Sequence, residues 1–85
     1  MPHVTVKLWP GRTEKRKQVL VDKIVRTVME ETEVDESAVS VSIEEVPKEK
    51  WVTEVYNPQI KEKQEILYKK PGYTPESLRS HEETD

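Results

Sequence analysis

The order of hydrophobic patterns in residues 1–46 constrains the fold of this chain more than any other feature. Residues 3–9, HVTVKLW, alternate apolar and polar side chains, as a half-buried strand does. Residues 39–46, VSVSIEEV, alternate in the same way until Pro47, which cannot donate to a strand ladder. Between them the apolar spacing changes to that of a helix. The pattern therefore predicts strand, helix, strand.

The predicted helix has a clear start. Thr13 is a suitable N-cap, and Glu14 places a negative charge in the first turn, where the helix dipole favours it. We expect the helix to end near Thr32. Its apolar stripe follows the spacing i, i+3, i+4, i+7. The stripe consists of Val21, Ile24, Val25 and Val28, and Leu20 widens it.

These elements predict an α/β protein with a β-α-β protomer and two parallel strands, because a helix crossover joins parallel neighbours. Two strands with one helix form too small a sheet to be stable alone. A chain of 85 residues also buries only about 60% of its surface on folding. We therefore expect a partner subunit to extend the sheet.

The second half of the chain predicts one more helix. Asn57 and Pro58 form an N-cap and N1 pair, and the helix is expected over residues 58–70. The residues KKPGY would stop it. We expect one small domain over residues 1–73 and a polar C-terminal tail over residues 74–85.

Composition excludes several classes of function. The net charge is −3 and no basic stripe is present, which argues against nucleic acid as a partner. There is no cysteine, and His3 and His81 are far apart, so we expect no metal site. No apolar run is long enough to span a membrane, and no signal-peptide pattern is visible. The expected location is the cytoplasm.

Pro2 is the candidate catalytic residue. Methionine before a small residue is generally removed, which would leave the ring nitrogen of Pro2 as a free secondary amine at the start of a strand. An α-amino group has a pKa of about 7.7–8.0, and both an apolar pocket and a nearby cation lower it. Such an amine can act as a general base at neutral pH. A Met-Pro start without any function is the simpler alternative.

Several motifs in matching order resemble one known family. They are Pro2 before a strand, Gly11–Arg12 after it, an amphipathic helix, a second alternating strand and an aromatic residue, Trp51. This set resembles the 4-oxalocrotonate tautomerases, small enzymes with an amino-terminal proline. The residues MPH, PKEKW and KKPGY are similar to the bacterial branch typified by the tautomerase PptA. The resemblance covers roughly residues 2–73.

The resemblance implies an isomerase that moves a proton between oxygen and carbon of a small 2-oxo or 2-hydroxy-enoate acid, without a cofactor. In that reading Pro2 is the general base and acid, Arg12 binds a carboxylate or the developing enolate, and Trp51 forms an aromatic wall. A guanidinium in a poorly solvated pocket would be a strong partner for that negative charge. Alternatively, Trp51 fills the core and Arg12 is a solvated loop residue.

The chain adds a geometric constraint. A strand of seven residues at about 3.3 Å per residue covers roughly 23 Å, so Pro2 and Arg12 of one chain cannot share a small substrate. If both act, Arg12 must come from a second copy across a two-fold axis.

Ser40 is a departure from the family pattern. It stands where the founding members carry a second arginine that binds substrate, so we expect Ser40 at the substrate site and a monocarboxylate substrate. We expect a homodimer, with a homohexamer as the alternative.

Two other functions stay open from the sequence. One is addition of water to an unsaturated acid, with Glu44, Glu45 or Tyr56 activating the water. The other is a small α/β binding module without catalysis. His3 could tune Pro2 or be structural, the role of Trp9 is open, and Lys69 and Lys70 could cap a helix end or attract an anionic substrate.

Overall fold

The computed structural model describes residues 1–78 and divides the chain into two compact units. The first unit is Met1–Val46, and the second starts at Pro47. Each unit is described by itself.

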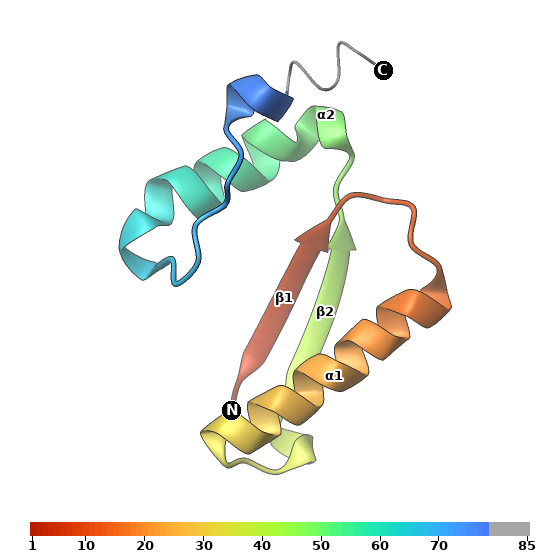
Figure 1. Cartoon of the computed structure of the whole chain (residues 1–85). Helices are drawn as coiled ribbons and strands as arrows, with labels where there is room; N and C mark the ends of the chain where they lie inside the picture. Colours follow the sequence, from red (N-terminus) through yellow and green to blue (C-terminus); the bar gives the residue numbers. More distant parts are fainter. Residues whose placement is uncertain (79–85) are drawn as a thin grey trace. The chain divides into compact units, whose positions relative to one another are not determined.

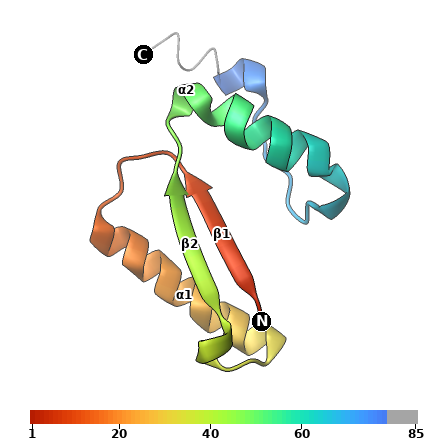
Figure 2. The same cartoon turned by 180° about the vertical axis from the view of Figure 1, so that it is seen from behind.

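The first unit is the predicted β-α-β arrangement (Figure 1). It runs through β1 (His3–Leu8), α1 (Glu14–Thr32), a short 3-10 turn, η1 (Glu36–Ala38), and β2 (Ser40–Glu45). The two strands are parallel, with His3 opposite Ser40 and Leu8 opposite Glu45. In both views α1 lies beside β2, and β1 lies on the far side of β2 (Figure 2). The prediction of two parallel strands joined by a helix is confirmed.

Local sequence signals explain where α1 begins and ends. The Thr13 side chain accepts a hydrogen bond from the Arg16 backbone N–H (3.1 Å), as an N-cap does. At the other end Glu33 adopts a left-handed conformation (φ 54°), which stops the helix after Thr32. Both predicted ends of this helix are confirmed.

The first unit has a thin core. Among residues 1–78 only Val46 of the first unit and Val55 of the second unit are buried, and no residue of α1 is. The apolar positions that face the sheet are half-buried: Val21, Ile24, Val25 and Val28. A helix that packs on a two-stranded sheet thus leaves much of its apolar stripe within reach of solvent, as expected for so small a sheet.

The second unit is mainly one helical segment made of α2 (Lys48–Trp51), η2 (Val52–Ile60) and η3 (Lys61–Ile66). We expected this helix to begin at Pro58 and continue to Lys70. It begins at Lys48 instead, and Pro58 lies inside η2, which is a π-helix. Proline has no N–H to donate to the preceding turn, and the wide π-helical turns accommodate it within the helical segment.

The end of the helix also differs from the expectation. Lys63 has non-helical dihedrals, and Leu67 is already extended. Lys69 and Lys70 therefore lie beyond the helix, and the Lys69 ammonium donates to the Lys70 carbonyl (3.1 Å) rather than to a helix terminus. Of the predicted tail, residues 75–78 form a helical turn, while residues 79–85, including His81, lie outside the described residues.

Candidate active site

Pro2 is held at the start of the sheet by β2. Its carbonyl oxygen accepts a hydrogen bond from the Ser40 backbone N–H (3.2 Å), which continues the ladder one residue before β1 begins. Pro2 itself is half-buried, whereas Met1 is 99% exposed. The candidate base thus sits on a fixed backbone, and the residue in front of it is open to an aminopeptidase.

A row of hydroxyl and imidazole groups lies on the sheet next to Pro2. The His3 Nδ1 is 2.6 Å from the Ser40 Oγ, and the His3 Nε2 is 3.3 Å from the Thr5 Oγ1. The Ser42 hydroxyl donates to the Thr5 Oγ1 (3.3 Å), so the row crosses between the strands. His3 is thereby tied to the position where the family pattern has an arginine. Sequence reasoning placed His3 on this polar side but missed its contact with Ser40.

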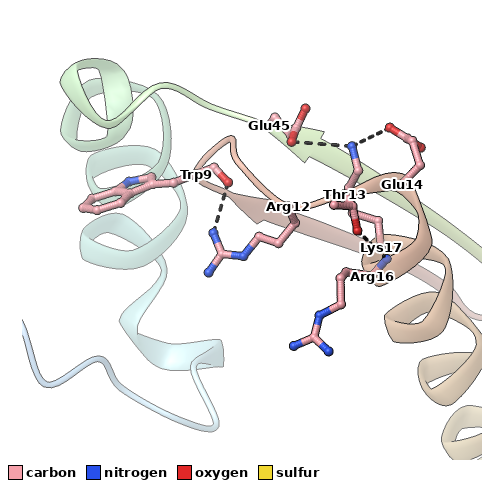
Figure 3. A network of polar contacts seen from close by, with 7 residues as sticks. All are labelled: Trp9, Arg12, Thr13, Glu14, Arg16, Lys17 and Glu45. Atoms are coloured by element: carbon pink, nitrogen blue, oxygen red, sulfur yellow. Dashed lines mark hydrogen bonds and ion pairs between the residues drawn. The ribbon is translucent and has the colours of Figure 1, made fainter.

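Arg12 lies at the opposite end of β1, in the turn before α1 (Figure 3). Its Nη1 donates to the Trp9 carbonyl oxygen (3.2 Å), which fixes the guanidinium close to its own turn. Gly11 has φ 128°, a conformation that strains any residue with a Cβ, so this turn depends on glycine. Because β1 has six residues of about 3.3 Å each, Pro2 and Arg12 of one chain are separated by the full length of the strand.

Ion pairs tie the start of α1 to the end of β2. The Lys17 ammonium lies 2.8 Å from a carboxylate oxygen of Glu14 and 3.5 Å from one of Glu45 (Figure 3). The hydrogen bond that the Lys17 ammonium donates to Glu14, together with the negative charges of Glu14 and Glu45, raises the pKa of Lys17 above its ordinary value. Two carboxylates therefore balance the positive charge of Lys17, whereas the other cations at this end of the helix have no such ion pair among residues 1–78.

Trp51 lies in an aromatic cluster of the second unit. Its indole Nε1–H donates to the Tyr73 hydroxyl (2.9 Å), and the Tyr73 ring lies 5.9 Å from that of Tyr56 at 50°. The indole edge is therefore already engaged. Sequence reasoning missed Tyr73 in this role, although the KKPGY motif that contains it was visible.

The other candidates for activating water also have partners. Glu44 pairs with Lys7 (3.5 Å), Glu45 pairs with Lys17, and Tyr56 packs against Tyr73. Glu44 and Glu45 end β2, at the opposite end of the sheet from Pro2. Within one chain, neither the Glu44 nor the Glu45 carboxylate can activate water for a substrate bound at Pro2.

Residues 1–78 hold no group of three or more side chains that could bind a metal ion. No helix within that range is long and apolar enough to cross a membrane.

Comparison with known proteins gives consistent matches. Residues 2–57 match the model of the family described as tautomerase enzyme. A probable tautomerase of Xylella fastidiosa is 45% identical over 73 residues, which cover 86% of this chain and 89% of the relative. Tautomerase PptA of Cronobacter sakazakii is 35% identical, with 86% and 97% covered.

A solved structure agrees with these matches. A 4-oxalocrotonate tautomerase isozyme of Methylibium petroleiphilum superposes with a TM-score of 0.57 at 36% identity, over 59% of this chain and 81% of that one. The resemblance inferred from Pro2, Gly11–Arg12 and the later motifs is thereby confirmed. The chain belongs to the tautomerase family and is an isomerase related to PptA and to the 4-oxalocrotonate tautomerases.

Proposed function

We propose that this chain is a cofactor-independent keto–enol tautomerase of 2-oxo and 2-hydroxy-enoate acids, with the Pro2 nitrogen as general base and then general acid. Once Met1 is removed, the nitrogen is a secondary amine in a rigid ring. It takes a proton from the enol or from carbon, and returns it at another carbon of the same substrate. The observation that carries the proposal is the Ser40 hydrogen bond that fixes Pro2 at the end of the sheet.

Arg12 supplies the positive charge in this scheme. Proton transfer beside a carbonyl places negative charge on oxygen, and a guanidinium stabilises it by charge-assisted hydrogen bonds. Because Arg12 lies a full strand away from Pro2 of its own chain, it acts on the substrate held at the Pro2 of a second copy. The site is therefore a property of a dimer.

Trp51 and Ser40 define the substrate in this proposal. The indole provides an aromatic wall, held by its hydrogen bond to Tyr73. Ser40 brings no positive charge to the position where the family pattern has an arginine, so this position supplies no cation for a second carboxylate. An aryl or alkyl enolpyruvate fits these conditions better than a dicarboxylate.

The test uses protein whose N-terminus is confirmed by mass spectrometry. Trimmed protein should ketonise phenylenolpyruvate, followed by loss of the enol absorbance. Pro2→Ala should lower kcat/KM by about 100-fold or more, the usual loss when a positioned base is removed. Protein that retains Met1 should be equally impaired, because its Pro2 nitrogen is an amide.

Pro75→Ala is the matched control, since it makes the same change in a helical turn of the second unit. It should leave kcat/KM within about twofold of the parent, well below the expected effect at Pro2. If Pro2→Ala ketonises as fast as Pro75→Ala, the proline mechanism is wrong.

A further inference from the structure

A hollow of about 270 Å³ lies on α1 next to the Arg12 turn. It is lined by Arg12, Arg16, Val19, Leu20 and Lys23. Apart from Arg12, these residues have no role in the proposed mechanism. The hollow belongs entirely to the first unit, so its walls are fixed by one turn and one helix.

The helical residues of the hollow form one stripe. Arg16 and Lys23 are seven positions apart, and Val19 and Leu20 lie between them at i+3 and i+4, so all four share a side of α1. The two aliphatic side chains are 42% and 37% exposed. Apolar side chains therefore form the floor between two cations.

The charge of this hollow is uncompensated. Its lining holds three cations and no carboxylate. Arg12 donates to a neutral carbonyl, and within residues 1–78 neither Arg16 nor Lys23 forms an ion pair. The nearby Lys17 differs, because Glu14 and Glu45 neutralise it.

We propose that this hollow binds the carboxylate and the apolar body of the substrate, with Arg16 as a second carboxylate-binding cation beside Arg12. The apolar body lies on Val19 and Leu20, and Lys23 adds positive charge at the far end. The inference rests on the proposed function, since it assigns Arg12 to the substrate, and it adds the residues that hold the carboxylate and the aryl or alkyl group. An apolar floor favours such a group, and guanidinium groups that line the same hollow favour a carboxylate.

The test measures binding without turnover. The probe is 3-phenylpropanoate, which has the carboxylate and the aryl group but no enol, and the readout is the shift of backbone amide signals in NMR. We expect the amides of Val19 and Leu20 to shift on titration. Acetate, which lacks the apolar body, should bind at least about tenfold more weakly.

Two variants of the same helix separate site binding from general attraction. Arg16→Gln should raise the Kd for 3-phenylpropanoate by about tenfold or more. Lys15→Gln removes the same charge one residue earlier, outside the hollow, and should change the Kd by no more than about twofold. In turnover, Arg16→Gln should raise KM for phenylenolpyruvate more than it lowers kcat.

The outcomes distinguish this inference from the proposed function. Equal weakening by Arg16→Gln and Lys15→Gln, or shifts confined to other residues, would overturn the inference even if Pro2→Ala is inactive. Conversely, if Pro2→Ala remains active while Arg16→Gln still loses 3-phenylpropanoate, the hollow binds the anion but the proline mechanism is wrong.

Discussion

The Ser40 backbone N–H donates to the Pro2 carbonyl oxygen, and the Ser40 hydroxyl lies 2.6 Å from the His3 Nδ1. One residue of β2 therefore holds both the candidate base and its neighbour. The backbone hydrogen bond does not depend on the side chain at position 40. The charge of that side chain can therefore change while the hydrogen bond to Pro2 is kept. In the proposed mechanism, the charge preference for the substrate and the placement of the base are thus separable.

Changing the charge at position 40 should change the preferred substrate. Ser40→Arg adds a cation at the Pro2 end, and it should raise kcat/KM for 2-hydroxymuconate, a dicarboxylate, relative to phenylenolpyruvate by about tenfold. The measurement is the ratio of the two kcat/KM values in trimmed protein.

Two controls accompany this variant. Ser40→Ala loses only the His3 contact, and Ser42→Arg adds the same cation two residues farther along β2. Neither should change the ratio by more than about twofold. If Ser40→Ala shifts the ratio as much as Ser40→Arg does, the lost His3 contact explains the effect and the charge argument is wrong.

Most of the first unit could be predicted from sequence because its signals are local. The alternation around Val41 and the cap at Thr13 each act within a few residues, and the structure contains both elements. The end-to-end separation of Pro2 and Arg12 follows from strand length alone.

The second unit could not be predicted as well, because its structure depends on non-local contacts. Pro58 is a strong signal for a helix start, yet it lies inside a π-helix that begins earlier. The Trp51–Tyr73 hydrogen bond joins residues 22 positions apart, and no periodic pattern in the sequence indicates it. A motif such as KKPGY marks a resemblance without saying which side chain its tyrosine contacts.

The Trp51–Tyr73 hydrogen bond should stabilise the second unit. Tyr73→Phe keeps the ring but leaves the part-buried indole N–H without this acceptor, which should cost about 1 kcal/mol. For a domain of this size that lowers Tm by about 4–8 °C. In a Trp9→Phe background, where Trp51 is the sole tryptophan, its fluorescence spectrum should shift as well.

Tyr68→Phe is the matched control, because Tyr68 is fully exposed. It should leave both Tm and the emission spectrum unchanged. Equal Tm values for Tyr73→Phe and Tyr68→Phe would show that the hydrogen bond does not contribute.

Asp35 should make stability depend on pH in the acid range. The Ser37 hydroxyl (2.7 Å) and the Ser37 backbone N–H (3.1 Å) both donate to its carboxylate and lower the pKa of Asp35 below 3.8. A lowered folded-state pKa gives stability that is present above the unfolded value and is lost as the pH falls through the folded value. Asp35→Asn cannot titrate, so its Tm deficit should be present at about pH 7 and should shrink as the pH falls below 3.8.

Asp22→Asn is the control for a general change in net charge. Asp22 accepts a hydrogen bond from Gln18 on α1 and takes no part in the η1 turn. A deficit of Asp35→Asn that persists in acid, or that Asp22→Asn reproduces at each pH, would contradict the assignment to the Ser37 hydrogen bonds.

The open edge of β1 should carry the dimer contact. In a parallel pair, alternate residues bond to the neighbouring strand. Since the Pro2 and Leu8 carbonyls accept from the N–H groups of Ser40 and Val46, the N–H of Thr5 points to the other edge. The sheet side that carries His3, Thr5 and Ser42 is polar, so burying it between stacked dimers would be costly. With a chain of 10.0 kDa, light scattering should therefore give about 20 kDa rather than the roughly 60 kDa of a hexamer.

Thr5→Pro tests which edge is used. Proline is tolerated on a strand edge that faces solvent, but it removes the N–H that a partner strand would need. Thr5→Pro should therefore shift the mass to about 10 kDa and make Pro2 unable to act with a partner's arginine, while Thr5→Ala, which keeps the N–H, stays near 20 kDa. A mass of about 20 kDa for both variants would place the contact elsewhere, and a parent mass near 60 kDa would show that the polar side of the sheet is buried after all.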